Sequence, residues 1–248
     1  MKSERLFDDG QHCWIALGRD PEKKEQVIDT NEYLIISHGE GLLLDPGGTE
    51  IFPQVLAAIS DQIEIASLKA FFASHQDPDV MSSLPLWMAL CPHATIHMPK
   101  IWSGFMAHFG YEYIDNFKLM PDEGGTLKIG EHGRTLQLIP AHYVHSSANF
   151  SVYDPHARIL FSGDIGGALL PDDAQELYVE DFDRHIAYME GFHRRWMPSN
   201  RAKNDWVRRV RALEIDQLCP QHGGIFRGEN VKKFLDWFEA LEVGCAIA

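Results

Sequence analysis

The sequence has little that would favour a membrane, an oxidising compartment or a nucleic acid. No apolar run approaches the length of a membrane span, and the first residues lack the apolar core of a signal peptide. Cysteines are few and scattered, with no Cys-x-x-Cys pair, which predicts reduced, mostly buried thiols in the cytoplasm rather than a disulfide framework. Basic side chains are also few, 22 against 36 acidic ones, and the net charge of −14 argues against nucleic acid or anionic membrane as a main partner.

A local cluster of basic residues is still present in the last quarter of the chain. Arg194 and Arg195 follow a histidine, and Arg208, Arg209 and Arg211 lie close together further on. We predict that these side chains lie on solvated faces of helices.

What is present is an ordinary globular composition, 45% hydrophobic and 23% charged over 248 residues, which is enough chain for one α/β domain. Hydrophobic periodicity predicts strands at 33–37, 41–45, 68–74, 94–98, 135–140, 149–154, 159–162 and 215–220. It predicts helices at 49–59, 80–90, 100–109, 181–195, 202–213 and 230–241. Two similar halves of strands followed by helices predict two stacked sheets with helices on both outer faces, in a single domain of residues 1–248.

The pentapeptide His75-Gln76-Asp77-Pro78-Asp79 follows the apolar run 68–74 and concentrates three possible metal ligands. Alternate residues of an extended segment point the same way, and Pro78 favours an extended backbone at Asp77. One imidazole and two carboxylates could therefore converge at the end of a strand. The same residues are also typical of a helix N-terminus, with Asp77 as the N-cap and Pro78 in the first turn.

Three later polar residues stand in the same setting, just after an apolar strand. They are His145, Asp164 and His222, in the segments 139–146, 160–167 and 218–224. Taken singly, His145 could be a loop histidine, Asp164 a turn residue between glycines, and His222 a residue that only ends a strand. Four such coincidences at strand ends are much less expected than one, and strand ends are where α/β proteins commonly place their sites.

These residues together resemble the metallo-β-lactamase superfamily. The order His75-x-Asp77-x-Asp79, His145, Asp164, His222, preceded by Asp45-Pro46-Gly47, is most similar to the diiron domain of flavodiiron proteins and to stand-alone oxygen-binding diiron proteins. The resemblance runs over about residues 30–240, and the segment 220–227 is especially similar to that branch. It implies an αββα metallo-β-lactamase-like sandwich.

The resemblance also implies a ligand set for two metal ions. His75, Asp77, His145 and Asp164 would hold one metal, and Asp79, Asp164 and His222 the other, with Asp164 as the bridge. Hydrolases of the superfamily carry a second histidine at the position of Asp77, whereas the diiron branch carries a carboxylate. Mixed carboxylate and imidazole sites suit iron or manganese, and imidazole-rich sites suit zinc. We therefore expect two iron ions, with zinc or manganese as the alternative.

One position departs from the family motif, because Val80 stands where a histidine is expected. Either the second site is more open, or another residue supplies the ligand. His142, three residues before His145, is the candidate for the second case. The other histidines, such as His93, His97, His108 and His185, are interpreted as structural.

By resemblance, the leading hypothesis is a non-haem diiron protein that binds dioxygen or nitric oxide. It would act as a sensor or carrier, or as a reductase with a separate electron donor, and dimers are common among such proteins. No phosphate-binding glycine loop marks a flavin site in this chain. The alternatives are a binuclear metal-dependent hydrolase, in which a metal-bound hydroxide attacks an ester or phosphodiester, and a metal-free interaction module.

Overall fold

The computed structural model describes residues 3–18, 28–109, 111–171, 174 and 176–245. They divide into two compact units: the described residues of Met1–Glu22 and Thr30–Leu136 form unit 1, and those of Lys23–Asp29 and Gln137–Ala248 form unit 2. Each unit combines strands of a β-sheet with helices, so the predicted α/β class is confirmed. The assignment of the whole chain to one domain stays a prediction.

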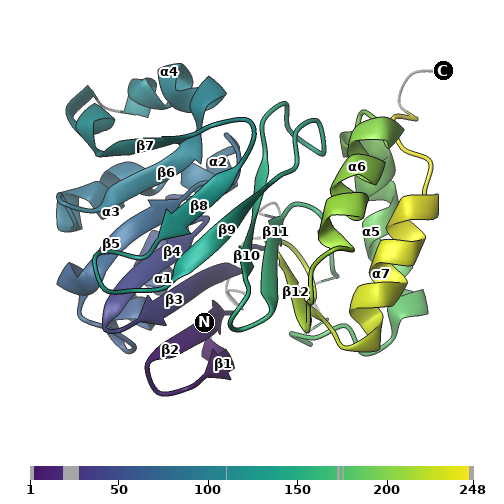
Figure 1. Cartoon of the computed structure of the whole chain (residues 1–248), viewed down its shortest axis with the longest axis horizontal. Coiled ribbons are helices and arrows are strands. Elements are labelled where there is room, and N and C mark those ends of the chain that lie inside the picture. The colour runs from purple at the N-terminus through teal and green to yellow at the C-terminus, as the bar shows by residue number, and fades with distance from the viewer. Residues whose placement is uncertain (1–2, 19–27, 110, 172–173, 175, 246–248) are drawn as a thin grey trace. The chain divides into compact units, whose positions relative to one another are not determined.

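Unit 1 contains a seven-stranded sheet whose strands follow one another in sequence order (Figure 1). The strands are β1 (Ser3–Asp8), β2 (His12–Leu17), β3 (Glu32–Ser37), β4 (Glu40–Leu44), β5 (Leu68–Phe72), β6 (Thr95–Pro99) and β7 (Phe117–Met120). The first four pair antiparallel, and β4 to β7 pair parallel. The parallel strands therefore end at the same edge, where β4 and β5 are each followed by polar residues.

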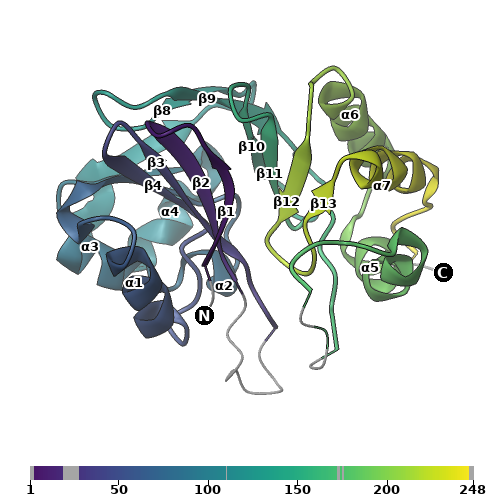
Figure 2. The ribbon, with the colours of Figure 1, turned by 90° about the horizontal axis from the view of Figure 1, so that it is seen from below.

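Helices α1 (Phe52–Ser60) and α3 (Leu84–Leu90) lie on one face of this sheet (Figures 1 and 2). Their apolar side chains, among them Val55, Ile59 and Trp87, join Phe71 of β5 in one buried cluster. The ring of Trp87 meets Phe71 at a centroid distance of 5.8 Å. Burial of large aromatic side chains in this way stabilises the contact between helix and sheet.

The predicted helix 80–90 is wrong in one respect, because it is broken. It consists of α2 (Pro78–Met81) and α3, which begins at Leu84. Pro85 has no N–H to donate to the carbonyl of Met81, and its ring would clash there, so the first helix ends. The predicted helix 100–109 is likewise replaced by single 3₁₀ turns and the short helix α4 (Ser103–Met106).

The hairpin of β1 and β2 was not predicted. All six residues of β2 are buried, so the strand shows no alternation of polar and apolar residues. The turn signal is nevertheless present, because Gly10 adopts φ +86° and its N–H donates to the Asp8 carboxylate.

Unit 2 contains a second sheet with the order β13-β12-β11-β10-β9. Its strands are β9 (Thr135–Pro140), β10 (Phe150–Asp154), β11 (Ile159–Gly163), β12 (Gln217–Pro220) and β13 (Phe226–Arg227). Strands β11 and β12 are parallel, and the other pairs are antiparallel. The short strand β8 (Gly125–Lys128) precedes β9 in the chain.

Three helices of unit 2 lie together beside β12 (Figure 1): α5 (Phe182–Trp196), α6 (Asn200–Val210) and α7 (Glu229–Ala240). Side-chain caps begin two of them, since Asp181 accepts from the N–H of Arg184 and Ser199 from that of Ala202. Their apolar faces form one buried cluster with Leu160 and Leu218 of the sheet. The three helices therefore cover one side of the strands that carry Asp164 and His222.

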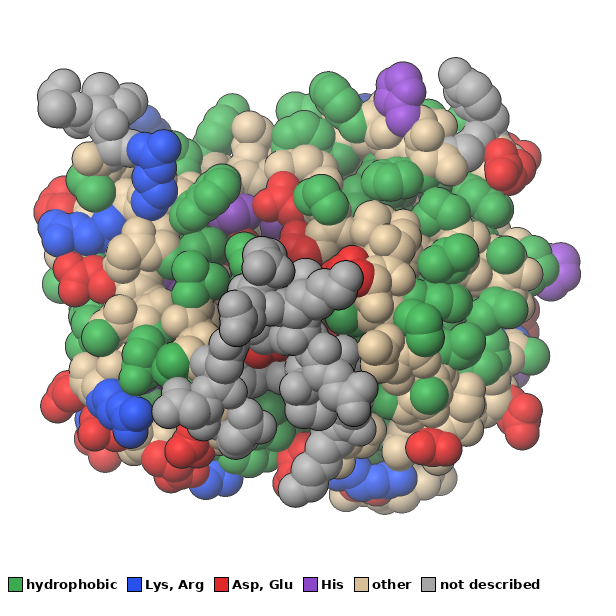
Figure 3. Space-filling view, turned by 180° about the vertical axis from the view of Figure 1, so that it is seen from behind, with side chains coloured by type: hydrophobic (Ala, Val, Ile, Leu, Met, Phe, Trp, Pro, Cys, Tyr) green, Lys and Arg blue, Asp and Glu red, His purple; other side chains and the backbone are tan. Residues whose placement is uncertain are grey.

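Surface and thiol predictions can be compared with the described residues. Arg208 and Arg209 pair with Asp205, and Arg211 pairs with Asp236 and Glu239, all on solvated helix faces as predicted. Acidic and basic side chains are interspersed over the described part of the face in Figure 3. The cysteines are free thiols, three buried and Cys245 exposed. No described helix is long and apolar enough to cross a membrane.

Candidate metal centre

In unit 1, the candidate residues follow the ends of the parallel strands β4 and β5. The N–H of Asp45 donates to the carbonyl of Phe72 at 2.8 Å, which extends the pairing of the two strands by one residue. Asp45 adopts φ +42°, an unusual value for a non-glycine residue. This turn directs its carboxylate towards Ser74, next to the candidate ligand His75.

The carboxylate of Asp45 fixes the protonation state of the His75 ring through Ser74. The Ser74 hydroxyl donates to Asp45 Oδ2 at 2.6 Å, and the Ser74 N–H donates to Asp45 Oδ1 at 2.7 Å. The hydroxyl oxygen is then free to accept the Nδ1–H of His75, which lies 2.8 Å away. The proton therefore lies on Nδ1 and leaves the Nε2 lone pair of this fully buried ring for a metal.

Asp77 occupies the helix-start position that the sequence also allowed. It is the N-cap residue of α2, with an extended backbone, and Pro78 and Asp79 occupy the first turn. Its side chain makes no capping hydrogen bond, however. The carboxylate lies 3.4 Å from His75 Nε2 and accepts from the side-chain amide of Gln76 at 2.8 Å. Asp77 thus has the backbone of a cap and the side-chain direction of a ligand.

In unit 2, Asp164 and His222 follow neighbouring parallel strands. Gly163 is paired with Pro220, and the N–H of Gln221 donates to the carbonyl of Gly163 at 2.8 Å. The strands β11 and β12 therefore end side by side, and the residues after them lie close together. The positive φ of Gly163 turns the chain sharply before Asp164.

The Asp164 carboxylate faces one histidine with each of its oxygens. His145 Nε2 lies 3.2 Å from Oδ2, and His222 Nε2 lies 3.5 Å from Oδ1. His222 Nδ1 lies 2.7 Å from the carbonyl oxygen of Asp29, which only accepts, so Nδ1 carries a proton. The lone pair of His222 Nε2 then faces a carboxylate oxygen, an arrangement that favours a cation, a proton or a metal ion, between them. These donors fit two metal ions that the Asp164 carboxylate would bridge.

His145 is held in a tight loop with strained backbone. It adopts φ +74° and Tyr143 adopts φ +58°, values that cost non-glycine residues about 1–2 kcal/mol each. The loop is closed by the Tyr143 N–H donating to the Ser146 carbonyl and by the Asn149 amide donating to the Val144 carbonyl. The His145 ring stacks on Phe192 at a centroid distance of 5.8 Å. Such local strain persists where surrounding contacts impose it, which is common at functional sites.

His193 supports this region, although it stands in a basic run of the sequence and was not predicted to do so. His193 is fully buried, and burial lowers its pKa to about 4, so the ring is neutral. Its Nδ1 donates to the carbonyl of Met189 at 2.7 Å, and its Nε2 accepts the N–H of Gly166 at 2.9 Å. The His193 ring therefore stabilises the turn after β11 that contains Asp164 and Gly166.

Two predictions about the remaining positions stay open. Val80 is fully buried and packs in the apolar cluster of unit 1. His142 contacts the Phe150 ring edge-on at 5.0 Å. The role of His142 as the replacement for the missing histidine stays a prediction. Of the histidines interpreted as structural, His97 and His185 are largely buried, and burial lowers the pKa of each to about 4.

Solved structures resemble the chain over nearly its whole length. A structure described as the peroxy diiron species of the chemotaxis sensor ODP is 38% identical, with a TM-score of 0.87, and the match covers 98% of this chain and 97% of that one. A flavo-diiron protein mutant from Thermotoga maritima is 19% identical, with a TM-score of 0.78, over 96% of this chain and 60% of that one. The chain therefore has the metallo-β-lactamase-like fold that the sequence predicted.

The family follows from the sequence comparison. The profile described as ODP family beta lactamase matches residues 28–223, and the chain belongs to this family. An uncharacterized protein of Methanocaldococcus jannaschii is 26% identical over 218 residues, which cover 84% of this chain and 52% of that protein. The chain thus spans about half the length of the curated relative that it matches.

Proposed function

We propose that this chain is a non-haem diiron protein that binds dioxygen, or nitric oxide, as a sensor or carrier. The observation that carries the proposal is the Asp164 carboxylate, which faces His145 with one oxygen and His222 with the other. A carboxylate with one imidazole near each oxygen suits a bridge between two metal ions. The similarity to a protein described as a diiron chemotaxis sensor supports the same function.

The proposed ligand sets are those that the family resemblance implies. His75, Asp77, His145 and Asp164 would hold one iron, and Asp79, Asp164 and His222 the other. Mixed oxygen and nitrogen donors suit iron or manganese better than zinc. When bound, ferrous iron supplies the open coordination positions and the electrons that capture of dioxygen requires. The residues of the chain hold the ligands in place: Ser74 orients His75, and the carbonyl of Asp29 orients His222.

Sensing is favoured over sustained reduction and over hydrolysis. The 38% identical structure is described as a chemotaxis sensor, whereas similarity to flavodiiron proteins at 19% concerns the fold alone. No flavin-binding loop is recognisable in the sequence. A reductase would therefore need a separate protein as its electron donor. A hydrolytic zinc site would favour an imidazole where this chain has Asp77. A homodimer, a signalling partner and a cytoplasmic location belong to the same proposal.

Metal analysis after anaerobic purification tests the proposal. We expect iron at about two per chain, and a change in the absorption spectrum when the reduced protein meets dioxygen or nitric oxide. Stoichiometric zinc together with esterase or phosphodiesterase activity would instead support the hydrolase. A chain that binds no metal under any of these conditions would favour the interaction module.

The variant Asp164→Asn tests the bridge directly. The amide keeps the shape of the side chain but lacks the charge, so both metals should lose affinity together and iron content should fall to a small fraction of wild type. Asp216→Asn is the matched control, because Asp216 is exposed and pairs with Arg158 on the surface of unit 2. Full iron content in Asp164→Asn would show that the ligand assignment is wrong.

A further inference from the structure

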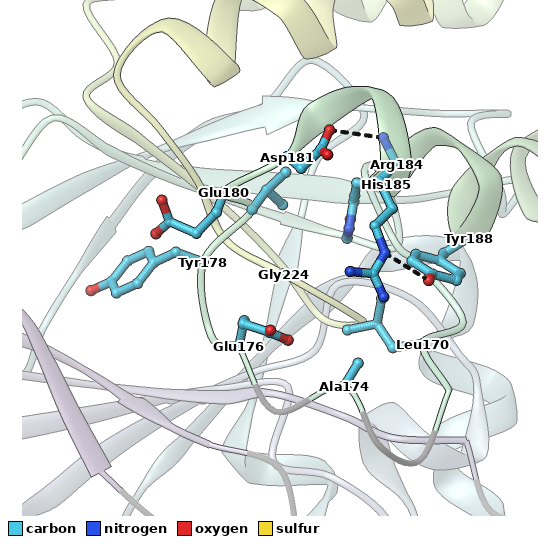
Figure 4. Close-up of a pocket in the computed structure, with 11 residues that line it drawn as sticks. Leu170, Ala174, Glu176, Tyr178, Glu180, Asp181, Arg184, His185, Tyr188 and Gly224 are labelled. Carbon is cyan, nitrogen blue, oxygen red and sulfur yellow. Dashed lines mark hydrogen bonds between the residues drawn. The ribbon is translucent and has the colours of Figure 1, made fainter.

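A half-open cavity of about 110 Å³ lies in unit 2, beside the first turns of α5 (Figure 4). Its lining includes Leu170, Glu176, Arg184, His185, Tyr188 and Gly224. An engineered apolar cavity of about 150 Å³ holds a benzene molecule, so this one suits a ligand of about six heavy atoms. The walls combine apolar surface with charged groups of both signs, which is typical of a small-molecule site.

His185 forms part of the wall of this cavity. The residue is only 6% exposed, and the rings of Phe226 and Tyr188 contact it edge-on at 5.5 and 6.2 Å. Its Nε2 is buried, and no described residue makes a hydrogen bond to it. The imidazole is therefore packed into the wall of the cavity, where the aromatic rings hold it in place.

Arg184 is the first sign of a ligand in this cavity. Its guanidinium extends into the cavity, and its Nε donates to the Tyr188 hydroxyl at 3.4 Å (Figure 4). No described carboxylate forms an ion pair with this guanidinium, so its terminal nitrogens remain available. The Tyr188 oxygen accepts from Arg184 and leaves its own proton to donate. A guanidinium beside a phenol hydroxyl is a donor set that suits a carboxylate.

The acidic residues around the cavity have different roles. Glu180 pairs with Arg227 at 2.7 Å, and Asp181 caps α5 by accepting from the Arg184 N–H at 3.0 Å. Glu176 makes no ion pair with a described residue, and it lies across the cavity from Arg184 in Figure 4. A simple anion would be repelled by Glu176, and a simple cation by Arg184.

We propose that this cavity binds a small zwitterion of the α-amino acid class. The carboxylate of the ligand lies at Arg184 and Tyr188, its ammonium group at Glu176, and its short side chain against Leu170. This site is separate from the proposed metal ligands, and its occupation does not depend on the proposed diiron function.

The binding wall is nevertheless connected to the segment that carries His222. The N–H of Leu169 donates to the carbonyl of Tyr188 at 3.0 Å, and the N–H of Ala168 donates to the carbonyl of His222 at 3.2 Å. Two adjacent amides therefore join the cavity to a candidate metal ligand. Gly224, two residues after His222, forms part of the wall itself.

Calorimetric titration of the metal-free full chain with three matched probes tests the proposal. Alanine carries both charges, propionate lacks the ammonium group and ethylamine lacks the carboxylate. We expect alanine to bind at least about tenfold more tightly than either single-charge probe, because each charged hydrogen bond contributes at least that factor. Absence of saturable binding of alanine, or equal affinity for propionate, would overturn the assignment.

Variants separate the two ends of the ligand. Arg184→Gln should weaken alanine and propionate about tenfold or more, and Glu176→Gln should weaken alanine and ethylamine to a similar extent. Arg208→Gln and Glu131→Gln are the matched controls, because both side chains are exposed and lie outside the cavity. Unchanged affinity for alanine in Arg184→Gln, with circular dichroism showing a folded protein, would contradict the proposal.

Discussion

At the scale of single residues, candidate ligands of both units have one ring nitrogen fixed by a second contact. His75 is fixed by the Ser74 hydroxyl, which Asp45 orients, and His222 by the carbonyl of Asp29. In both rings the proton consequently lies on Nδ1. Contacts of this kind fix the orientation of a ligand and raise its basicity in the metal-free protein.

The variant Ser74→Ala removes the link between Asp45 and His75. We expect iron affinity to fall about 10- to 100-fold, because the ring loses its fixed tautomer and orientation. Competition with a chelator measures this change. Ser74→Thr keeps the hydroxyl and should restore most of the affinity, and Ser60→Ala, at an exposed serine of unit 1, should have no effect. Wild-type affinity in Ser74→Ala would show that His75 needs no such support.

The candidate ligands could be identified in the sequence because each follows an apolar strand, a pattern that is recognisable without a structure. Ser74 and His193 could not be. Ser74 is an ordinary small residue at the end of a strand, and its role depends on Asp45, 29 residues earlier. His193 lies in a basic run, and only the packing of α5 shows that it is buried and contacts Gly166.

At the scale of elements, a buried lysine of one helix caps the C-terminus of another. Lys203 of α6 is only 1% exposed, and its ammonium group donates to the carbonyls of Phe238 and Glu239 in the last turn of α7. These carbonyls have no partner within the helix, and a positive charge there is favourable. The ammonium group therefore joins the two helices.

Lys203→Met keeps the aliphatic chain and removes the charge. We expect the free energy of unfolding to fall by about 1.5–3 kcal/mol, because two carbonyls lose a charged donor in a buried place. Denaturant titration followed by circular dichroism measures the loss. Lys232→Met, at an exposed position of α7, should change stability little, and an equal effect of both variants would contradict the capping role.

Elements with a clear period were predicted to within a few residues, and those without one were missed or misplaced. The strand β9 has the predicted bounds, whereas β2 is buried on both faces and carries no alternation. The break between α2 and α3 was foreseeable from Pro85. Its missing N–H ends the first helix even though the apolar run continues past it.

At the scale of the whole molecule, buried histidines make stability depend on pH. Burial lowers the pKa of His97, His185 and His193 from 6.5 to about 4. Between these values the unfolded chain binds more protons than the folded one. The histidine contribution to the free energy of unfolding of the metal-free protein should therefore fall as pH drops from 6.5 to about 4.

His193 alone, being fully buried, contributes a loss of up to about 3 kcal/mol. Urea denaturation at a series of pH values measures the slope. His97→Asn should flatten the curve, and His132→Gln, at a side chain that is 74% exposed, should leave it unchanged. A stability that does not vary over this window would show that the three rings are protonated in the folded protein.

Asp77 and His145 share a property that bears on how this protein evolves. Asp77 occupies a cap position without capping, and His145 keeps a left-handed backbone that glycine would adopt without strain. Substitutions that remove the candidate ligands at these places can therefore make the empty chain more stable. Selection for stability alone would therefore not favour these two residues.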